Sequence, residues 1–183
     1  MALQGKLRTP LRYITTHDSE GKATVDTSLA ASAPFYELPN KEAAFAQCYV
    51  TNSFPAKLNS DADLAVYKDF LASPPGLTVS GGSVLRYVDM PPGVTSPMHR
   101  TVSLDYGVVI EGEVELVLDS GETRVMKRGD ICVQRATMHA WRNMSDTEWA
   151  RMLYVLQPCE AFETAGGKTE EDLGTMGGVR ASS

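Results

Sequence analysis

The chain has 183 residues, 43% of them hydrophobic and 22% charged, which is ordinary for one folded domain and excludes disordered and collagen-like proteins. Its 17 basic and 23 acidic residues give a formal charge of -6, the wrong sign for a nucleic-acid surface or an anionic bilayer. Three widely spaced cysteines without a CxxC pair argue against a disulfide framework and fit a reducing compartment. Because no apolar run is long enough for a signal core or a membrane span, we expect a cytoplasmic protein that binds neither nucleic acid nor membrane.

Residues 1–59 predict an N-terminal arm of peripheral strands. The β-prone pieces LRYITT, KATVDTS and AQCYVTNSF are short, and Gly, Pro, Asn and Ser residues separate them. Pieces of this kind extend a larger sheet at its edges more readily than they form a core of their own. We therefore expect this region to add edge strands to the main domain.

Residues 60–75 predict one short amphipathic helix. Ser60 and Asp63 resemble a capping box at its start. Apolar side chains then recur at helical spacing until two consecutive prolines end the run: Leu64, Tyr67 and Leu71, followed by Pro74 and Pro75.

Residues 76–158 predict the core of the domain, a series of short strands. The strand segments are SVLRYVDM, DYGVVI, EVELVLD, TRVMK, ICVQ, HAWRN and ARMLYVL, and turn signals such as PPG and DSGE connect them. Several strands at this spacing in one domain indicate a sandwich or a closed barrel. Residues 159–183 are rich in glycine and charge, and they predict either a surface arm or a disordered tail.

Two of the three histidines stand where a barrel would bring them together. His99 follows the loop PPGVTSPM, and His139 begins the strand HAWRN after four intervening strand segments. If these strands wrap a small barrel, both imidazoles point into one cavity, and imidazole is the commonest metal ligand in proteins. His17 lies outside this arrangement, in a polar turn-like segment, and we expect it at the surface.

The segments around these two histidines resemble the two motifs of the cupin family. GVTSPMHRTVSLDYGVVIEG, from Gly93 to Gly112, is similar to the first motif, and GDICVQRATMHAWRN, from Gly129 to Asn143, is similar to the second. The resemblance implies an all-β fold, a double-stranded β-helix or jelly-roll barrel with an N-terminal arm of extra strands and one or two short helices.

The resemblance also implies a metal site, with changes from the usual ligand set. Thr101 stands at the position of the motif's second histidine, and Asp105 stands at that of its glutamate. The remaining set, His99, Asp105 and His139, would hold a divalent metal such as Fe, Mn, Zn or Ni and would also be catalytic. Asp is one methylene shorter than Glu, so Asp105 either comes close to the metal or acts through a water. A metal-free pocket is the alternative.

Three further residues are candidates for substrate binding. Trp141 is two residues beyond His139 and shares its face of the strand, where it either packs in the core or stacks on a flat substrate. Arg86 interrupts an apolar strand, and it either lies on an exposed face or points inward to recognise an anion, in which case its guanidinium needs a carboxylate. Thr101 is the third candidate, beside His99.

The cupin resemblance implies a small-molecule substrate but no single reaction. The wider stretch, including SPMHRT, LDYGVVIEGE and HDSEGKA, is similar to small cupins of polyketide and aromatic metabolite pathways. We prefer a metal-dependent oxidoreductase or oxygenase acting on a small oxygenated metabolite. A lyase, dehydratase, cyclase or isomerase is the alternative, and a non-catalytic ligand-binding cupin is a further one. Because edge strands and apolar arm segments need covering, we also expect a homodimer.

Overall fold

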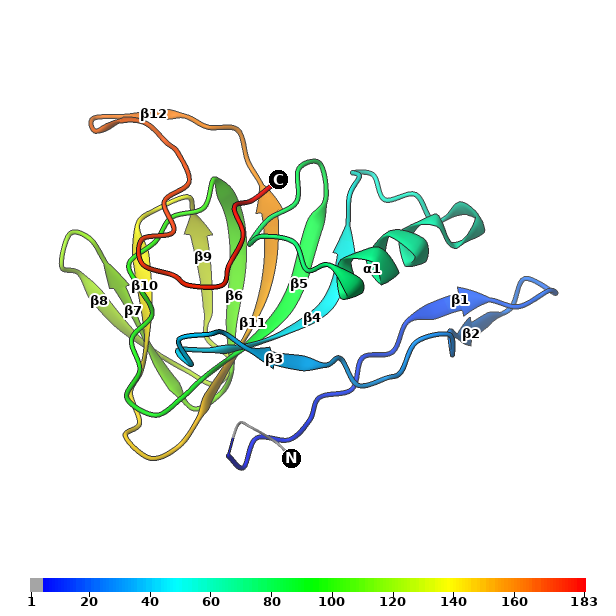
Figure 1. Ribbon diagram of the computed structural model, residues 1–183, viewed down its shortest axis with the longest axis horizontal. Helices are drawn as coiled ribbons and strands as arrows, with labels where there is room; N and C mark the ends of the chain where they lie inside the picture. Colours follow the sequence, from blue (N-terminus) through cyan, green and yellow to red (C-terminus); the bar gives the residue numbers. More distant parts are fainter. Residues whose placement is uncertain (1–4) are drawn as a thin grey trace.

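The computed structural model describes residues 5–183, and two antiparallel sheets enclose its main core (Figure 1). The larger sheet has six strands in the order β3-β4-β5-β11-β6-β9, and the smaller has three in the order β10-β7-β8. The bounds are Phe35–Glu37 (β3), Ala44–Thr51 (β4), Ser83–Met90 (β5), Ser103–Glu111 (β6), Glu113–Leu118 (β7), Thr123–Lys127 (β8), Ile131–Arg135 (β9), His139–Asn143 (β10) and Ala150–Pro158 (β11). This confirms the predicted all-β jelly-roll barrel.

The strands that surround the cavity follow the predicted segments closely, because alternation and turn residues agree there. SVLRYVDM, TRVMK and HAWRN coincide with β5, β8 and β10. The inward side chains of β6 are the alternate residues Ser103, Asp105 and Val109, all buried, whereas Tyr106 between them is exposed. Period-two burial of this kind decides which side chains reach the interior of the barrel.

The N-terminal arm is only partly peripheral. A hairpin of β1 (Thr15–His17) and β2 (Ala23–Val25) extends away from the barrel, and β3 forms the edge of the large sheet (Figure 1). The next strand, β4, is an interior strand between β3 and β5, and its residues from Ala44 to Cys48 are buried. The prediction of edge strands is therefore wrong for β4.

One short helix lies beside β4. In α1 (Ala62–Ala72) the buried Tyr67 donates a hydrogen bond from its hydroxyl to the backbone oxygen of Gln47 in β4, at 2.7 Å. The helix packs against the main core, whereas the outward-facing Ala46 and Cys48 of β4 lie in a separate small cluster with Ala33. The predicted helix is confirmed, but the predicted capping box is wrong. A short turn, η1 (Asn59–Asp61), precedes the helix, Ser60 adopts a left-handed φ of 55°, and the N-cap Asp61 forms no capping hydrogen bond.

No helix within residues 5–183 has the length and apolar content needed to cross a membrane.

The C-terminal tail is an arm that crosses the barrel. After a small hairpin of β12 (Glu163–Thr164) and β13 (Gly167–Lys168), it passes over one face of the molecule (Figure 1). Leu173, Met176 and Val179 pack against the main core. At its end, the backbone oxygen of Ser183 accepts a hydrogen bond from the Ser80 amide at 2.5 Å. The tail therefore takes the first of the two predicted forms and adds side chains to the interior.

Candidate active site

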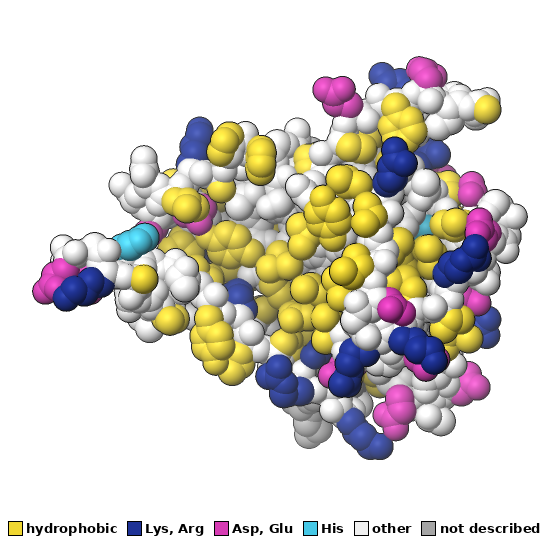
Figure 2. Space-filling view, turned by 180° about the vertical axis from the view of Figure 1, so that it is seen from behind, with side chains coloured by type: hydrophobic (Ala, Val, Ile, Leu, Met, Phe, Trp, Pro, Cys, Tyr) yellow, Lys and Arg dark blue, Asp and Glu magenta, His cyan; other side chains and the backbone are white. Residues whose placement is uncertain are grey.

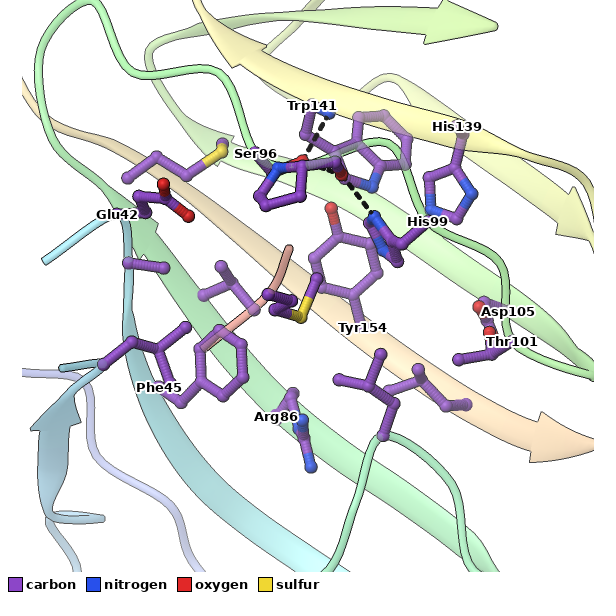
Figure 3. Close-up of a pocket in the computed structure, with 18 residues that line it drawn as sticks. Glu42, Phe45, Arg86, Ser96, His99, Thr101, Asp105, His139, Trp141 and Tyr154 are labelled. Atoms are coloured by element: carbon purple, nitrogen blue, oxygen red, sulfur yellow. Dashed lines mark hydrogen bonds between the residues drawn. The ribbon is translucent and has the colours of Figure 1, made fainter. Parts of the chain in front are cut away.

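One cavity of about 70 Å³ inside the barrel is lined by all six residues that the sequence identified (Figure 3). Three strands and the loop before β6 supply them: Arg86 from β5, Asp105 from β6, His139 and Trp141 from β10, and His99 and Thr101 from the loop. The predicted residues, which span 56 positions of sequence from 86 to 141, therefore share one cavity.

A backbone pairing brings His99 and His139 together. The His99 amide donates to the His139 carbonyl at 2.9 Å, and the His139 amide donates to the His99 carbonyl at 3.0 Å. Residues that exchange both hydrogen bonds lie directly opposite each other and present their side chains on the same face. The two imidazole centroids are accordingly 4.3 Å apart, as predicted for a pair that shares one cavity.

The hydrogen bonds of both rings leave the same nitrogen free. Nδ1 of His99 lies 2.8 Å from the Pro97 carbonyl oxygen, and Nδ1 of His139 lies 2.9 Å from the Thr137 carbonyl oxygen. Because a carbonyl oxygen can only accept, each Nδ1 must carry the proton and donate it. In the neutral ring the lone pair is then on Nε2. Backbone carbonyls that fix the tautomer in this way are the usual partners of metal-binding histidines.

Burial keeps both rings neutral. Desolvation and, to a smaller extent, the nearby His99 lower the pKa of His139 to about 3. Desolvation also lowers the pKa of His99, although its hydrogen bond to Pro97 acts in the opposite sense. Two neutral imidazoles, each with a free Nε2 lone pair, are therefore available as ligands or as proton acceptors at neutral pH.

Asp105 lines another part of the same cavity, beside Thr101 (Figure 3). Desolvation raises its pKa to about 7, and this outweighs the lowering effect of the Ser103 and Thr101 hydroxyls and of Arg86. Its Oδ1 is buried and has no hydrogen-bond partner among the described residues. The Thr101 hydroxyl is instead 2.6 Å from the Ser103 hydroxyl. Asp105 is therefore a buried carboxyl group that is about half protonated near neutral pH.

The predicted three-ligand set is brought together only in part. Within residues 5–183, no group of three or more His, Cys, Asp and Glu side chains is arranged so that it could hold a metal ion. His99 and His139 form a pair with free Nε2 atoms, so the chain offers two fitting imidazole ligands. Asp105 does not join them as a direct third ligand, which agrees with the shorter reach of aspartate.

Aromatic side chains form one wall of the cavity. Trp141 meets His139 edge-on, with ring centroids 5.5 Å apart, and meets Tyr154 of β11 at 5.8 Å. Its backbone is held by Ser96, whose hydroxyl accepts a hydrogen bond from the Trp141 amide at 2.9 Å. Trp141 thus both packs in the core and exposes a ring edge to the cavity, so the two predicted roles are compatible.

The other lining residues were not identified from the sequence, and three of them show why. Tyr154 lies two residues from each of the buried Met152 and Leu156 in ARMLYVL and so shares their face of the strand. Strand periodicity could therefore have identified it as inward-facing. Phe45 comes from β4, which was expected to be peripheral, and Met176 comes from the tail. Neither of these two carried a local signal, because long-range packing determines their positions.

Comparison with known proteins identifies the family of the chain. Residues 86–156 match the family described as Cupin domain. The chain is 47% identical over 161 residues to phomopsin biosynthesis cluster protein C' of Diaporthe leptostromiformis, which covers 88% of this chain and 85% of that protein. It is also 47% identical over 168 residues to the cupin-domain-containing oxidoreductase fogC of Aspergillus ruber, covering 91% of this chain and 81% of that one.

Among solved structures, the Schizosaccharomyces pombe Cnp3 cupin domain is 13% identical, with a TM-score of 0.49 over 83% of this chain and 90% of that domain. The sequence relatives decide the assignment, since they are well above 30% identical over most of both chains. The chain belongs to the cupin family.

Proposed function

We propose that this protein is a metal-dependent cupin oxidoreductase that acts on a small oxygenated metabolite of the polyketide or aromatic type. The observation that carries the proposal is the pair of neutral imidazoles with both Nε2 atoms free inside one cavity. Relatives named as cupin-domain-containing oxidoreductases and as biosynthesis cluster proteins support the reaction class and the secondary-metabolic setting.

His99 and His139 would hold the divalent metal, one of Fe, Mn, Zn or Ni. When bound, such a metal supplies Lewis-acid polarisation of the substrate or activation of dioxygen. Asp105 would act from its own part of the cavity, either on a water molecule or by holding a proton near the substrate. Trp141 and Tyr154 would orient a flat substrate and exclude bulk water from the two imidazoles.

Metal binding is the first test. We expect chelator-treated protein to bind about one equivalent of Mn²⁺ or Zn²⁺ in isothermal titration calorimetry, and protein purified without chelator to contain metal by elemental analysis. The free Nε2 pair is the physical reason. If chelator-treated protein takes up no divalent metal of any of the four kinds, the metalloenzyme proposal is wrong.

A non-oxidative reaction is the second candidate, and Asp105 favours it. A carboxylic acid with a pKa of about 7 can both give and take a proton at neutral pH, as a lyase, cyclase or isomerase requires. His139, neutral and buried, would be its partner in proton transfer. Turnover that persists after complete metal removal would favour this candidate over the oxidoreductase.

We further propose a homodimer, formed through the outer face of β6 and β9. Three apolar side chains are exposed there, with Tyr106 at 40%, Ile131 at 65% and Val133 at 53%, and Tyr106 pairs directly with Val133. Hydrophobic side chains gather over the middle of this side of the molecule (Figure 2). Strand β9 is also the free edge of the large sheet, and edges of this kind are usually covered.

Light scattering tests the dimer. We expect a mass of twice 19.9 kDa for the parent protein, and a single-chain mass for the double variant Ile131→Asp, Val133→Lys, because charges would be buried in the interface. Val125→Lys, at an exposed position of β8, is the matched control and should remain dimeric. A single-chain mass for the parent at high concentration would contradict the proposal.

A further inference from the structure

Arg86 is a buried cation in the wall of the cavity. On β5 it stands between the inward-facing Val84 and Val88, and only 2% of its surface is exposed. The sequence left open whether it lies on an exposed face or points inward, and the structure answers that it points inward. Burial lowers the pKa of its guanidinium from the ordinary value, which reflects the free-energy cost of holding a charge there.

The hydrogen bonds of Arg86 go to neutral partners alone. Its Nη2 donates to the Gln47 side-chain oxygen at 3.2 Å and to the Gly76 carbonyl at 2.8 Å. Among residues 5–183, no Asp or Glu carboxylate lies within salt-bridge distance of it. Its Nε and the Gln47 Nε2 are buried donors without a partner in the described part of the chain. The carboxylate that an inward guanidinium needs is not supplied by the protein.

A second buried arginine in the same barrel is paired with a carboxylate and serves as a comparison. Arg151 of β11 is 4% exposed, and it forms two hydrogen bonds of 2.6 Å to the two carboxylate oxygens of Asp89. This bidentate pair lies on the opposite face of the large sheet from the cavity. Arg151 therefore has a structural partner and Arg86 has none, although the two residues are almost equally buried.

The nearest acid in the cavity does not fill this role. Asp105 raises the pKa of Arg86 through its charge, but it lies beyond 4.0 Å and is itself half protonated near neutral pH. The Arg86 guanidinium carbon instead lies over the Phe45 ring, 5.0 Å from its centroid. A planar, oriented guanidinium is suited to bidentate recognition of a carboxylate.

We propose that Arg86 binds the carboxylate of an aromatic or polyketide-type acid, and that this acid is the substrate class of the cavity. The inference rests on the proposed function, since it assigns a ligand to the same cavity. Apart from the site residues, the lining is largely apolar, with Phe45, Leu156 and Met176, which suits a flat hydrocarbon body. Arg86 and the two histidines lie on opposite sides of Tyr154 (Figure 3). A ligand anchored at Arg86 would extend its other end toward the imidazoles.

A matched pair of ligands tests this in chelator-treated protein, where no metal can bind a carboxylate. Benzoate and benzamide have nearly the same shape, but only benzoate is charged. We expect calorimetry or ligand-observed NMR to give a Kd for benzoate at least about tenfold lower than for benzamide. In Arg86→Met, verified as folded by circular dichroism, this preference should disappear. Equal affinity for the two ligands in the parent protein would overturn the proposal.

Two further variants keep the test decisive. Arg86→Lys retains the charge without the planar fork and should bind benzoate several-fold more weakly while still preferring it, so an unchanged Kd for benzoate overturns the proposal even if Arg86→Met does not fold. Arg86 also borders a second cavity, beneath the tail, which Arg180 lines and the histidines do not. Arg180→Met should therefore leave the preference intact, and loss of the preference there would mean that the anion binds under the tail instead.

The failure of this proposal can be told apart from failure of the metal proposal. The benzoate preference and the metal affinity are measured separately on the chelator-treated protein, because Arg86 and Phe45 need no metal to bind a carboxylate. Retained benzoate binding together with absent metal binding would contradict the metalloenzyme alone. Normal metal binding with no benzoate preference would contradict the carboxylate site alone.

Discussion

Replacing either His99 or His139 with alanine is expected to weaken Mn²⁺ or Zn²⁺ binding by about 100-fold or more. Changes to groups that merely orient a metal ligand already cost 10- to 100-fold in affinity, and here a ligand itself is removed from a set that offers only two imidazoles. The measurement is a calorimetric titration of chelator-treated protein, with circular dichroism to verify the fold.

His17→Ala is the matched control for these two variants. His17 is an exposed residue at the end of β1, on the hairpin that extends away from the barrel, so its loss should leave metal affinity unchanged. Thr101→Ala should have a smaller effect than either histidine variant, because a neutral hydroxyl is a poor ligand beside imidazole. If both histidine variants kept the metal affinity of the parent, the metal-free pocket would become the leading account.

The barrel strands were predictable from the sequence because each one obeys a local rule. In β5, β8 and β10 the strand-forming residues end at turn residues, so the boundaries follow directly. The arrangement of β4 was not predictable in this way. Its residues AFAQCYVT are buried on both faces and therefore show no clean alternation, because a second cluster around Ala33 covers the face that points away from the main core. The tail is similar, since Leu173, Met176 and Val179 lie in a glycine-rich segment without regular periodicity.

The site residues also differ in how far the sequence could predict their positions. The resemblance to two motifs was enough to predict that His99 and His139 share a cavity, because one backbone pairing connects them. It was not enough to say whether Asp105 reaches them, because that depends on the length of a side chain and the path of β6. The role of Arg86 depended most on the structure, since only its full set of neighbours reveals that no carboxylate of residues 5–183 lies within salt-bridge distance of it.

Asp105→Asn is expected to stabilise the metal-free protein at pH 8 by about 4 kcal/mol, and much less at pH 4. The folded protein raises the pKa of Asp105 from 3.8 to about 7, and each unit corresponds to about 1.36 kcal/mol. Because the folded state binds the proton more tightly than the unfolded state, this contribution to stability is fully present below pH 3.8 and is lost as the pH rises to about 7. Asparagine stays neutral and has nearly the same shape, so it avoids the loss.

Urea denaturation at several pH values would measure this difference. In the parent, His139 acts with the opposite sign, because its pKa of about 3 in the folded state makes stability fall as the pH drops from 6.5 toward 3. The two effects oppose each other between about pH 4 and 6.5 in the parent, so Asp105→Asn should expose a clear rise of stability with pH over that interval. Asp119→Asn, in the exposed turn between β7 and β8, is the control and should follow the parent. If Asp105→Asn also followed the parent at every pH, Asp105 would be an ordinary ionised carboxylate in the folded protein, and its role as a proton-holding group in the cavity would be wrong.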